Sequence, residues 1–204
     1  MRLTRCPVAL PLQPGQTLAL PEEAANHLVR VMRLREGDAC VLFNGDGSDY
    51  TATLLAVGKR EVQVRIDAAR ALDNESPLAI TLLQGIARGE KMDLILQKAT
   101  ELGVTAIVPV NAERTEVKLD AARAGKRLAH WRSVVGAACG QSGRARIPAL
   151  SPPQALAAAA AALPAQSLRL TLDPLGEHRL SALPSAPAGG VVIAIGPEGG
   201  WSPR

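Results

Sequence analysis

The chain has 204 residues, 47% of them hydrophobic and 21% charged, with a net charge of +4. This length suits one large domain or two small ones, and the composition is that of a folded protein rather than a disordered one. The longest apolar run, residues 155–163, is far shorter than the roughly 20 residues of a membrane helix, and early prolines interrupt any signal-peptide core. Three cysteines without a CxxC pair argue against a disulfide framework or a zinc site and suit the cytoplasm, and the histidines show no metal-ligand spacing.

The first third of the chain predicts a short helix and several strands. Residues 21–33 begin with proline and two glutamates, which favour a helix N-terminus. Residues 39–44, 50–57 and 61–66 have strand patterns and are separated by glycine turns, which is typical of a small barrel or sandwich. Residues 67–77 lose this periodicity, so we expect a linker there.

The remaining sequence predicts an α/β domain. Residues 78–86 and 104–110 are apolar runs typical of strands buried on both faces, and the residues between them have helical spacing and end at Gly103. A strand, a helix and a second strand in this order imply a parallel sheet. Helices at 120–138 and 153–163 and strands at 168–172 and 191–195 are also expected. The predicted domains are residues 1–72 and 78–204, with residues 73–77 as linker.

Basic residues are concentrated in the segment 121–150, which contains no acidic residue. Such a segment either binds phosphate backbones or forms the solvated face of a helix, and charge alone leaves both interpretations open. The basic residues are Arg123, Lys126, Arg127, Arg132, Arg144 and Arg146.

A glycine-rich loop, Gly196-Pro-Glu-Gly-Gly200, follows the predicted strand 191–195. Ligands of α/β sheets bind beyond the carboxyl ends of the strands, and glycines let a backbone approach a ligand closely. The loop lacks GxGxxG and GxxxxGK[ST], which argues against dinucleotide and P-loop sites. An ordinary tight turn is the alternative, but we favour a ligand loop.

Two further polar segments are candidate binding sites. Arg88 and Lys91 flank the start of a predicted helix, where backbone N–H groups favour anions, while Lys98 and Glu101 lie further along it. The segment 140–146 is predicted to be a loop that could hold a phosphate or a base edge. The alternatives are exposed surface charges, an i,i+3 ion pair and a polar connector.

Several motifs in a fixed order closely resemble the RsmE family, the bacterial 16S ribosomal RNA uridine-N3 methyltransferases of the SPOUT superfamily. The resemblance runs over essentially the whole chain. The motifs are His27-Leu-Val-Arg-Val-Met-Arg33, Gln97-Lys-Ala-Thr-Glu-Leu-Gly-Val104, Pro109 followed by Glu113-Arg114, Trp131, Gln141-Ser-Gly-Arg144 with Pro148, and Ile195-Gly-Pro-Glu-Gly-Gly200.

The resemblance implies an N-terminal PUA-like RNA-binding barrel and a C-terminal knotted α/β methyltransferase domain. It also implies S-adenosylmethionine as cofactor, a homodimer, and a uridine of 16S rRNA in the small subunit as substrate, without metal or membrane. The implied cofactor residues are Leu172, at a Leu-Asp-Pro strand end, and Ile195, Gly196, Pro197, Glu198, Gly199 and Gly200. The implied RNA-binding residues are Arg30, Arg33, Arg88, Lys91, Lys98, Arg114, Gln141, Ser142 and Arg144.

Methylation of uridine N3 requires loss of the imide proton before the nitrogen attacks. A cation (Arg88, Arg114 or Arg144) could stabilise the developing anion, and a carboxylate (Glu101 or Glu198) could accept the proton. These assignments make Glu198, Glu101 and Arg114 the candidate catalytic residues.

Two departures from the family pattern give rise to alternatives. Gly140 stands where the family usually has Glu, and the family's helix and Leu-Gly-x-Arg motif beyond the glycine loop are absent from these 204 residues. We therefore expect this form to bind S-adenosylmethionine weakly or not at all, which leaves both an active methyltransferase and an inactive form open. One alternative is a non-catalytic ribosomal-RNA-binding protein without a complete cofactor pocket. Another is a small-molecule enzyme that uses the loop for phosphate.

Overall fold

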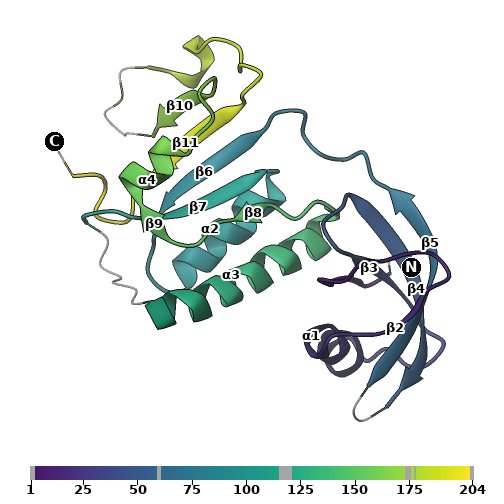
Figure 1. Cartoon of the computed structure of the whole chain (residues 1–204). Helices are drawn as coiled ribbons and strands as arrows, with labels where there is room; N and C mark the ends of the chain where they lie inside the picture. The colour runs from purple at the N-terminus through teal and green to yellow at the C-terminus, as the bar shows by residue number, and fades with distance from the viewer. Residues whose placement is uncertain (1–2, 59–60, 115–120, 173–175, 177, 203–204) are drawn as a thin grey trace. The chain divides into compact units, whose positions relative to one another are not determined.

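The structure is a computed structural model that describes residues 3–58, 61–114, 121–172, 176 and 178–202 (Figure 1). The chain divides into two compact units, Met1–Glu75 with Gly136–Ile147, and Ser76–Val135 with Pro148–Arg204. The boundary expected at residues 73–77 stays a prediction. The sequence did not predict that a later segment, Gly136–Ile147, belongs to the same unit as the N-terminal residues.

The first unit is built on a five-stranded mixed sheet with the order β1-β3-β4-β5-β2. Only β1 and β3 pair in parallel. Alternate residues of β5, including Val62, Val64 and Ile66, are buried in a core with Leu42 and Leu54. The strands are β1 (Arg5–Pro7), β2 (Thr17–Ala19), β3 (Ala39–Phe43), β4 (Ser48–Val57) and β5 (Val62–Ala71).

Strand β5 is longer than its sequence pattern indicates. Its end pairs with the start of β4 after a register shift between Thr51 and Ala52. The alternation of buried and exposed residues stops after Ile66 because residues 67–71 are all exposed. The expectation that residues 67–71 belong to a linker is therefore wrong: backbone pairing, rather than burial, extends the strand.

The helix expected at residues 21–33 is a composite. Helix α1 (Glu22–Ala25) continues directly into a π-helix, η1 (Asn26–Val31), and Leu28 of this turn is fully buried in the core. Pro21 precedes the first turn, and Glu22 and Glu23 lie in it, as the sequence indicates.

The second unit contains a parallel sheet with the order β10-β11-β6-β7-β8, and β9 also pairs in parallel with β7. The prediction of a parallel sheet is confirmed. The sequence did not predict strands β8 and β9, because each has only two residues and so shows no periodic pattern. The strands are β6 (Ile80–Gly85), β7 (Ala106–Asn111), β8 (Ala149–Leu150), β9 (Gln154–Ala155), β10 (Leu168–Thr171) and β11 (Val191–Ile195).

Helices cover this sheet. Helix α4 (Leu156–Ala161) packs through Ala159 on Leu83 and Val192, while α2 (Glu90–Glu101) and the part of α3 (Ala121–Ser142) that belongs to the second unit lie along the other face (Figure 1). A 3-10 turn, η2, spans Leu180–Ala182. Helix α3 includes Gly140–Ser142, so the expectation of a loop from residue 140 is wrong for these three residues. Within the described part of the chain, no helix is both long and apolar enough to cross a bilayer.

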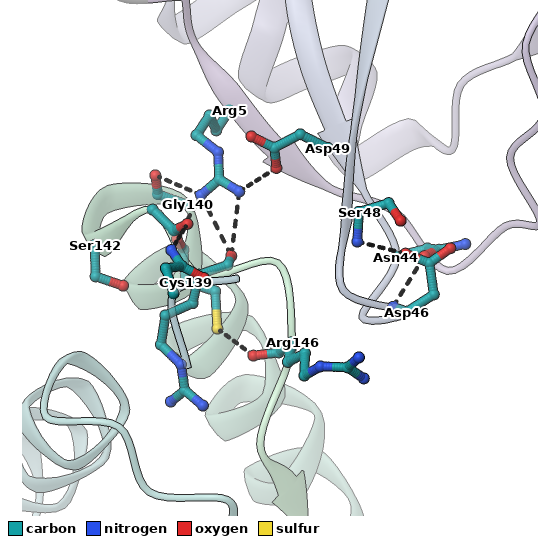
Figure 2. Close-up of polar contacts among 12 residues, drawn as sticks. Arg5, Asn44, Asp46, Ser48, Asp49, Cys139, Gly140, Ser142 and Arg146 are labelled. Carbon is teal, nitrogen blue, oxygen red and sulfur yellow. Dashed lines mark hydrogen bonds and ion pairs between the residues drawn. The ribbon is translucent and has the colours of Figure 1, made fainter. Parts of the chain in front are cut away.

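Arg5 holds the end of α3 inside the first unit (Figure 2). Its Nη1 donates to the Cys139 carbonyl at 2.9 Å, and both terminal nitrogens contact the Arg144 carbonyl at 3.3 Å. The same guanidinium pairs with Asp49 and lies 4.8 Å from the centre of the Phe43 ring. Since helix ends leave carbonyl groups without helical partners, a buried cation is well suited to this place.

Candidate functional site

The candidate site lies at the carboxyl edge of the parallel sheet in the second unit. In the register of the sheet, Ile195 of β11 is opposite Gln84 of β6, and Gly85 is opposite Val110 of β7. Thr171 of β10 is opposite Ala194 on the other side of β11. Four parallel strands therefore end at one edge, where their loops meet, as is usual for ligand sites in α/β folds.

The glycine-rich loop after β11 folds over Gly85 at this edge. A Cβ added to Gly85 would lie 2.5 Å from both the nitrogen and the Cδ of Pro197, so only glycine fits beneath the loop. The Pro197 carbonyl accepts a hydrogen bond from the Gly200 N–H at 2.9 Å, which closes a turn, and Gly200 has a φ of +67°. A Cβ at Gly200 would meet nothing within 4 Å, so the loop is open on that side.

Residues near the ends of two neighbouring strands, β6 and β7, contact this turn. The Arg88 N–H donates to Glu198 Oε1 at 3.2 Å, and Lys91 Nζ lies 3.6 Å from the same oxygen. Arg114 Nη1 donates to the Gly199 carbonyl at 3.1 Å. The structure thus brings together four residues that the sequence singled out separately, and it places the cationic groups of Lys91 and Arg114 against the glycine loop.

Hydrogen bonding keeps Glu198 ionised. Its own backbone N–H and that of Arg88, with the Lys91 ammonium nearby, lower the pKa of the Glu198 carboxyl below its ordinary value. A carboxylate with a lowered pKa is a weak proton acceptor. The geometry therefore fits a residue that holds the loop better than it fits a general base.

The residues at this edge fit S-adenosylmethionine, which has an adenine ring with apolar faces and several polar and charged groups. Leu172, just after β10, is 48% exposed, and Ile195 is partly buried. The buried Gln84 Oε1, opposite Ile195 in the register, has no hydrogen-bond partner within the described part of the chain. Asp173 and Pro174, expected beside Leu172, and Asp120, the expected start of α3, lie outside the described residues.

Glu101 and Lys98 are not part of this group. Glu101 is the last residue of α2, about 16 Å along the axis from the first, because a helix rises 1.5 Å per residue. It accepts hydrogen bonds from Lys98 and Gln97, each at 2.8 Å, and these lower its pKa. The i,i+3 ion pair considered as the alternative is what the structure contains.

The expected RNA-binding residues of the first unit have different environments. Arg30, Arg33 and Gln141 are exposed, whereas Ser142 donates its hydroxyl hydrogen bond to the Ala138 carbonyl within α3. Arg144 is buried, and its Nε and Nη2 contact the two carboxylate oxygens of Glu75 at 3.1 and 2.5 Å. Arg144 thus has a structural partner, and the acid-free segment 121–150 is not one continuous basic surface.

Sequence reasoning missed Arg5, Asp49, Glu75 and Gln84. Arg144 and Glu75 lie 69 positions apart, and Arg5 and Asp49 lie 44 apart, so no local pattern could pair them. Gln84 stands in an apolar run, and that interruption was the one available signal.

Comparison with known proteins agrees with this geometry. Residues 74–204 match the family described as RNA methyltransferase domain, and residues 20–67 match the RNA methyltransferase PUA domain. The ribosomal RNA small subunit methyltransferase E of Bacillus subtilis is 32% identical over 67% of this chain, and the match spans 54% of that protein's length. The protein of the same name from Mycobacterium bovis is 31% identical over 93% of this chain and 73% of its own.

Solved structures are also similar. The ribosomal RNA small subunit methyltransferase E of Neisseria gonorrhoeae, bound to S-adenosylmethionine, is 40% identical, with a TM-score of 0.93 over 98% of this chain and 82% of its own. A Legionella pneumophila methyltransferase with the same cofactor is 38% identical, with a TM-score of 0.93 over 99% and 83% of the two chains. The predicted fold, a PUA domain followed by a SPOUT methyltransferase domain, is confirmed, and the non-catalytic alternative is not favoured. The chain belongs to the RsmE family of S-adenosylmethionine-dependent ribosomal RNA methyltransferases.

Proposed function

We propose that this chain methylates N3 of a uridine in 16S ribosomal RNA of the small subunit, with S-adenosylmethionine as methyl donor. The observation that carries the proposal is the glycine loop at the carboxyl edge of the sheet, which is held by contacts of Glu198 and Arg114 and has the Lys91 ammonium beside it. Relatives named for ribosomal RNA of the small subunit support the choice of substrate.

The loop and its neighbours would bind the cofactor. Leu172 and Ile195 offer apolar surface, Gln84 Oε1 offers a buried acceptor, and Gly196–Gly200 offer backbone groups without side chains. S-adenosylmethionine, when bound, supplies a methyl group on a sulfonium sulfur. The chain would orient the reacting atoms about 3–3.5 Å apart, which can supply much of the rate.

Arg114 and Arg88 are the cations that we assign to the developing uridine anion. Both are exposed; the Arg114 guanidinium contacts the glycine loop and the Arg88 backbone adjoins it, where a positive charge favours a negative transition state. Arg144 is bound to Glu75 in the first unit, so we leave it out of this role. Glu198 would position the loop, and Glu101 would take no part in the reaction because of its place at the far end of α2, so the N3 imide proton would pass to solvent water.

The RNA would bind to exposed cations in both units. In the first unit these are Arg30 and Arg33, and in the second they are Arg88 and Lys91. Such contacts with phosphates make binding steeply dependent on salt. We also propose a homodimer, by family resemblance, and a cytoplasmic location, which suits a ribosomal substrate and three unpaired, buried cysteines.

Methylation of purified small subunits tests this proposal. Subunits from a strain that lacks the modification are incubated with the protein and S-adenosylmethionine, and the modified base is identified by mass spectrometry. We expect a single N3-methyluridine, and a much lower rate with Arg114→Gln than with Arg179→Gln, which removes an exposed arginine elsewhere in the second unit. Methylation of another base, or weak RNA binding without salt dependence, would contradict the proposal.

A further inference from the structure

The turn from Arg30 to Arg33 has an unusual backbone. It ends the π-helix η1, where the Met32 N–H donates to the His27 carbonyl at 2.9 Å, five residues back, and the Leu34 N–H donates to the Leu28 carbonyl at 3.0 Å. Arg33 has a φ of +60° and is the one non-glycine residue with positive φ in the described part of the chain. Both features are unfavourable for ordinary residues and occur mainly at functional sites.

This backbone exposes two apolar side chains beside two cations. Val31 is 66% exposed and Met32 is 44% exposed, and Arg30 and Arg33 on either side of them are also exposed. The neighbouring Leu28 is fully buried, so the wide turn places its apolar residues both in the core and on the surface. A regular amphipathic helix would leave one face apolar and one polar, rather than four consecutive exposed residues.

The charges near this turn favour an anionic partner. Three basic residues, Arg30, Arg33 and Arg35, lie within six positions, and the acidic residues that follow are Glu36 and Asp38. Asp38 Oδ2 accepts the Arg35 N–H at 2.7 Å, so this carboxylate closes the next turn. Apolar side chains between two arginines match the chemistry of an unpaired nucleotide, which has an apolar base face and charged phosphates on both sides.

We propose that Val31 and Met32 contact the faces of unpaired bases in the substrate RNA, while Arg30 and Arg33 bind the adjoining phosphates. This inference rests on the proposed function for its substrate class and adds a contact that does not depend on charge. The π-turn and the left-handed Arg33 present the two apolar side chains together, and the buried Leu28 anchors them to the core.

The two kinds of contact differ in their response to salt. Phosphate contacts release counterions, and each makes the slope of log K against log salt steeper (more negative) by about 0.7 for a single strand. Contacts with base faces release none. A Val31→Ser/Met32→Ser variant should therefore bind a small-subunit RNA at least tenfold more weakly with an unchanged slope, whereas Arg30→Gln should reduce the slope by about 0.7.

The experiment measures binding at several salt concentrations, with thermal unfolding to show that each variant is folded. Leu180→Ser is the matched control because Leu180 is an apolar residue of the second unit with a similar exposure of 69%, and it should bind as the wild type does. Arg33→Asn keeps a residue that tolerates positive φ, so it should make the salt slope less steep without altering the effect of the apolar pair.

Two results would overturn the inference. One is wild-type RNA affinity in the Val31→Ser/Met32→Ser variant, as expected if a protein partner covers the pair. The other is an affinity loss that comes with a reduced salt slope, as expected if the variant only displaces the arginines. Both results leave the proposed function intact as long as the wild-type protein still methylates the RNA. If the wild-type protein neither binds nor methylates the RNA, the proposed function is contradicted as well.

Discussion

The glycine loop of the second unit and the end of α3 in the first unit are both held by charged side chains that contact backbone, but they differ in burial. The side chains of Arg5 and Asp49 are 7% and 12% exposed, whereas those of Lys91 and Glu198 are 58% and 32% exposed. A buried pair is costly to break and keeps one geometry, while an exposed pair exchanges readily with water. The comparison indicates a structural role for the first group, and we propose a ligand-responsive role for the second.

Breaking the buried pair should have the largest effect. Arg5→Met leaves Asp49 buried without its cation and removes the donors to the end of α3, so it should lower the free energy of unfolding by about 3–5 kcal/mol. Denaturant titration measures this loss. The control is Arg65→Met, which breaks the more exposed Arg65–Asp67 pair and should cost less than about 1 kcal/mol. Equal losses of unfolding free energy in the two variants would contradict the difference between the buried and the exposed ion pair.

Filling the space beneath the glycine loop should have the next largest effect. Gly85→Ala places a Cβ 2.5 Å from Pro197, so the loop must shift, at a cost of about 1–3 kcal/mol in stability. We expect S-adenosylmethionine to bind at least about tenfold more weakly, as measured by calorimetry. Gly125→Ala, where the added Cβ meets nothing within 4 Å, is the matched control and should leave cofactor binding intact. Unaltered cofactor affinity in Gly85→Ala would place the site elsewhere.

Removing the charge of Glu198 should have a smaller effect. Glu198→Gln keeps an acceptor for the Arg88 N–H but loses the attraction to Lys91, so the KM for the cofactor should rise less than about fivefold, with kcat nearly unchanged. A hundredfold fall in kcat at saturating cofactor would instead make Glu198 the proton acceptor.

The pH dependence of the loop follows from the same residue. Because the folded pKa of Glu198 is lowered, its contribution is complete above the ordinary value of 4.5 and is lost only as the pH falls through the folded pKa. Cofactor affinity should therefore be constant from pH 7 to pH 5 as far as Glu198 is concerned. Loss of affinity between pH 7 and pH 5 in the wild type, but not in Glu198→Gln, would contradict this assignment.

The smallest effect is expected at the far end of α2. Glu101→Gln disrupts only the exposed contacts with Lys98 and Gln97, so kcat and the KM for the cofactor should match the wild type in steady-state assays. A large fall in kcat would indicate that Glu101 acts in the reaction.

Regular elements of the second unit could be predicted because their packing is periodic. Strands β6, β7 and β11 are apolar runs, and α2 buries Met92 and Leu96 at helical spacing. The π-helix could not be predicted, because a single turn with i→i+5 hydrogen bonds leaves no distinct pattern of apolar residues in the sequence. The end of α3 was missed because Gly140 and Ser142 favour a loop locally, whereas contacts from Arg5 hold this segment helical.

The site was predictable as a set of loops but not as a set of contacts. A glycine loop after a buried strand indicates a ligand site from sequence alone, as does the group of cations at the start of α2. The partners of those groups depend on tertiary structure. Arg144 was expected to face RNA, but it forms an ion pair with Glu75 within the first unit. A basic residue in a loop is equally suited to a phosphate and to a buried carboxylate.

Hydrogen–deuterium exchange with and without S-adenosylmethionine tests the central claim most directly. If the cofactor lies at the carboxyl edge of the parallel sheet, it should protect the amides of residues 85–88 and 196–200, and it should leave the amides of β4 and β5 in the first unit unaltered. Protection confined to the first unit, or no protection of the glycine loop at saturating cofactor, would contradict the account.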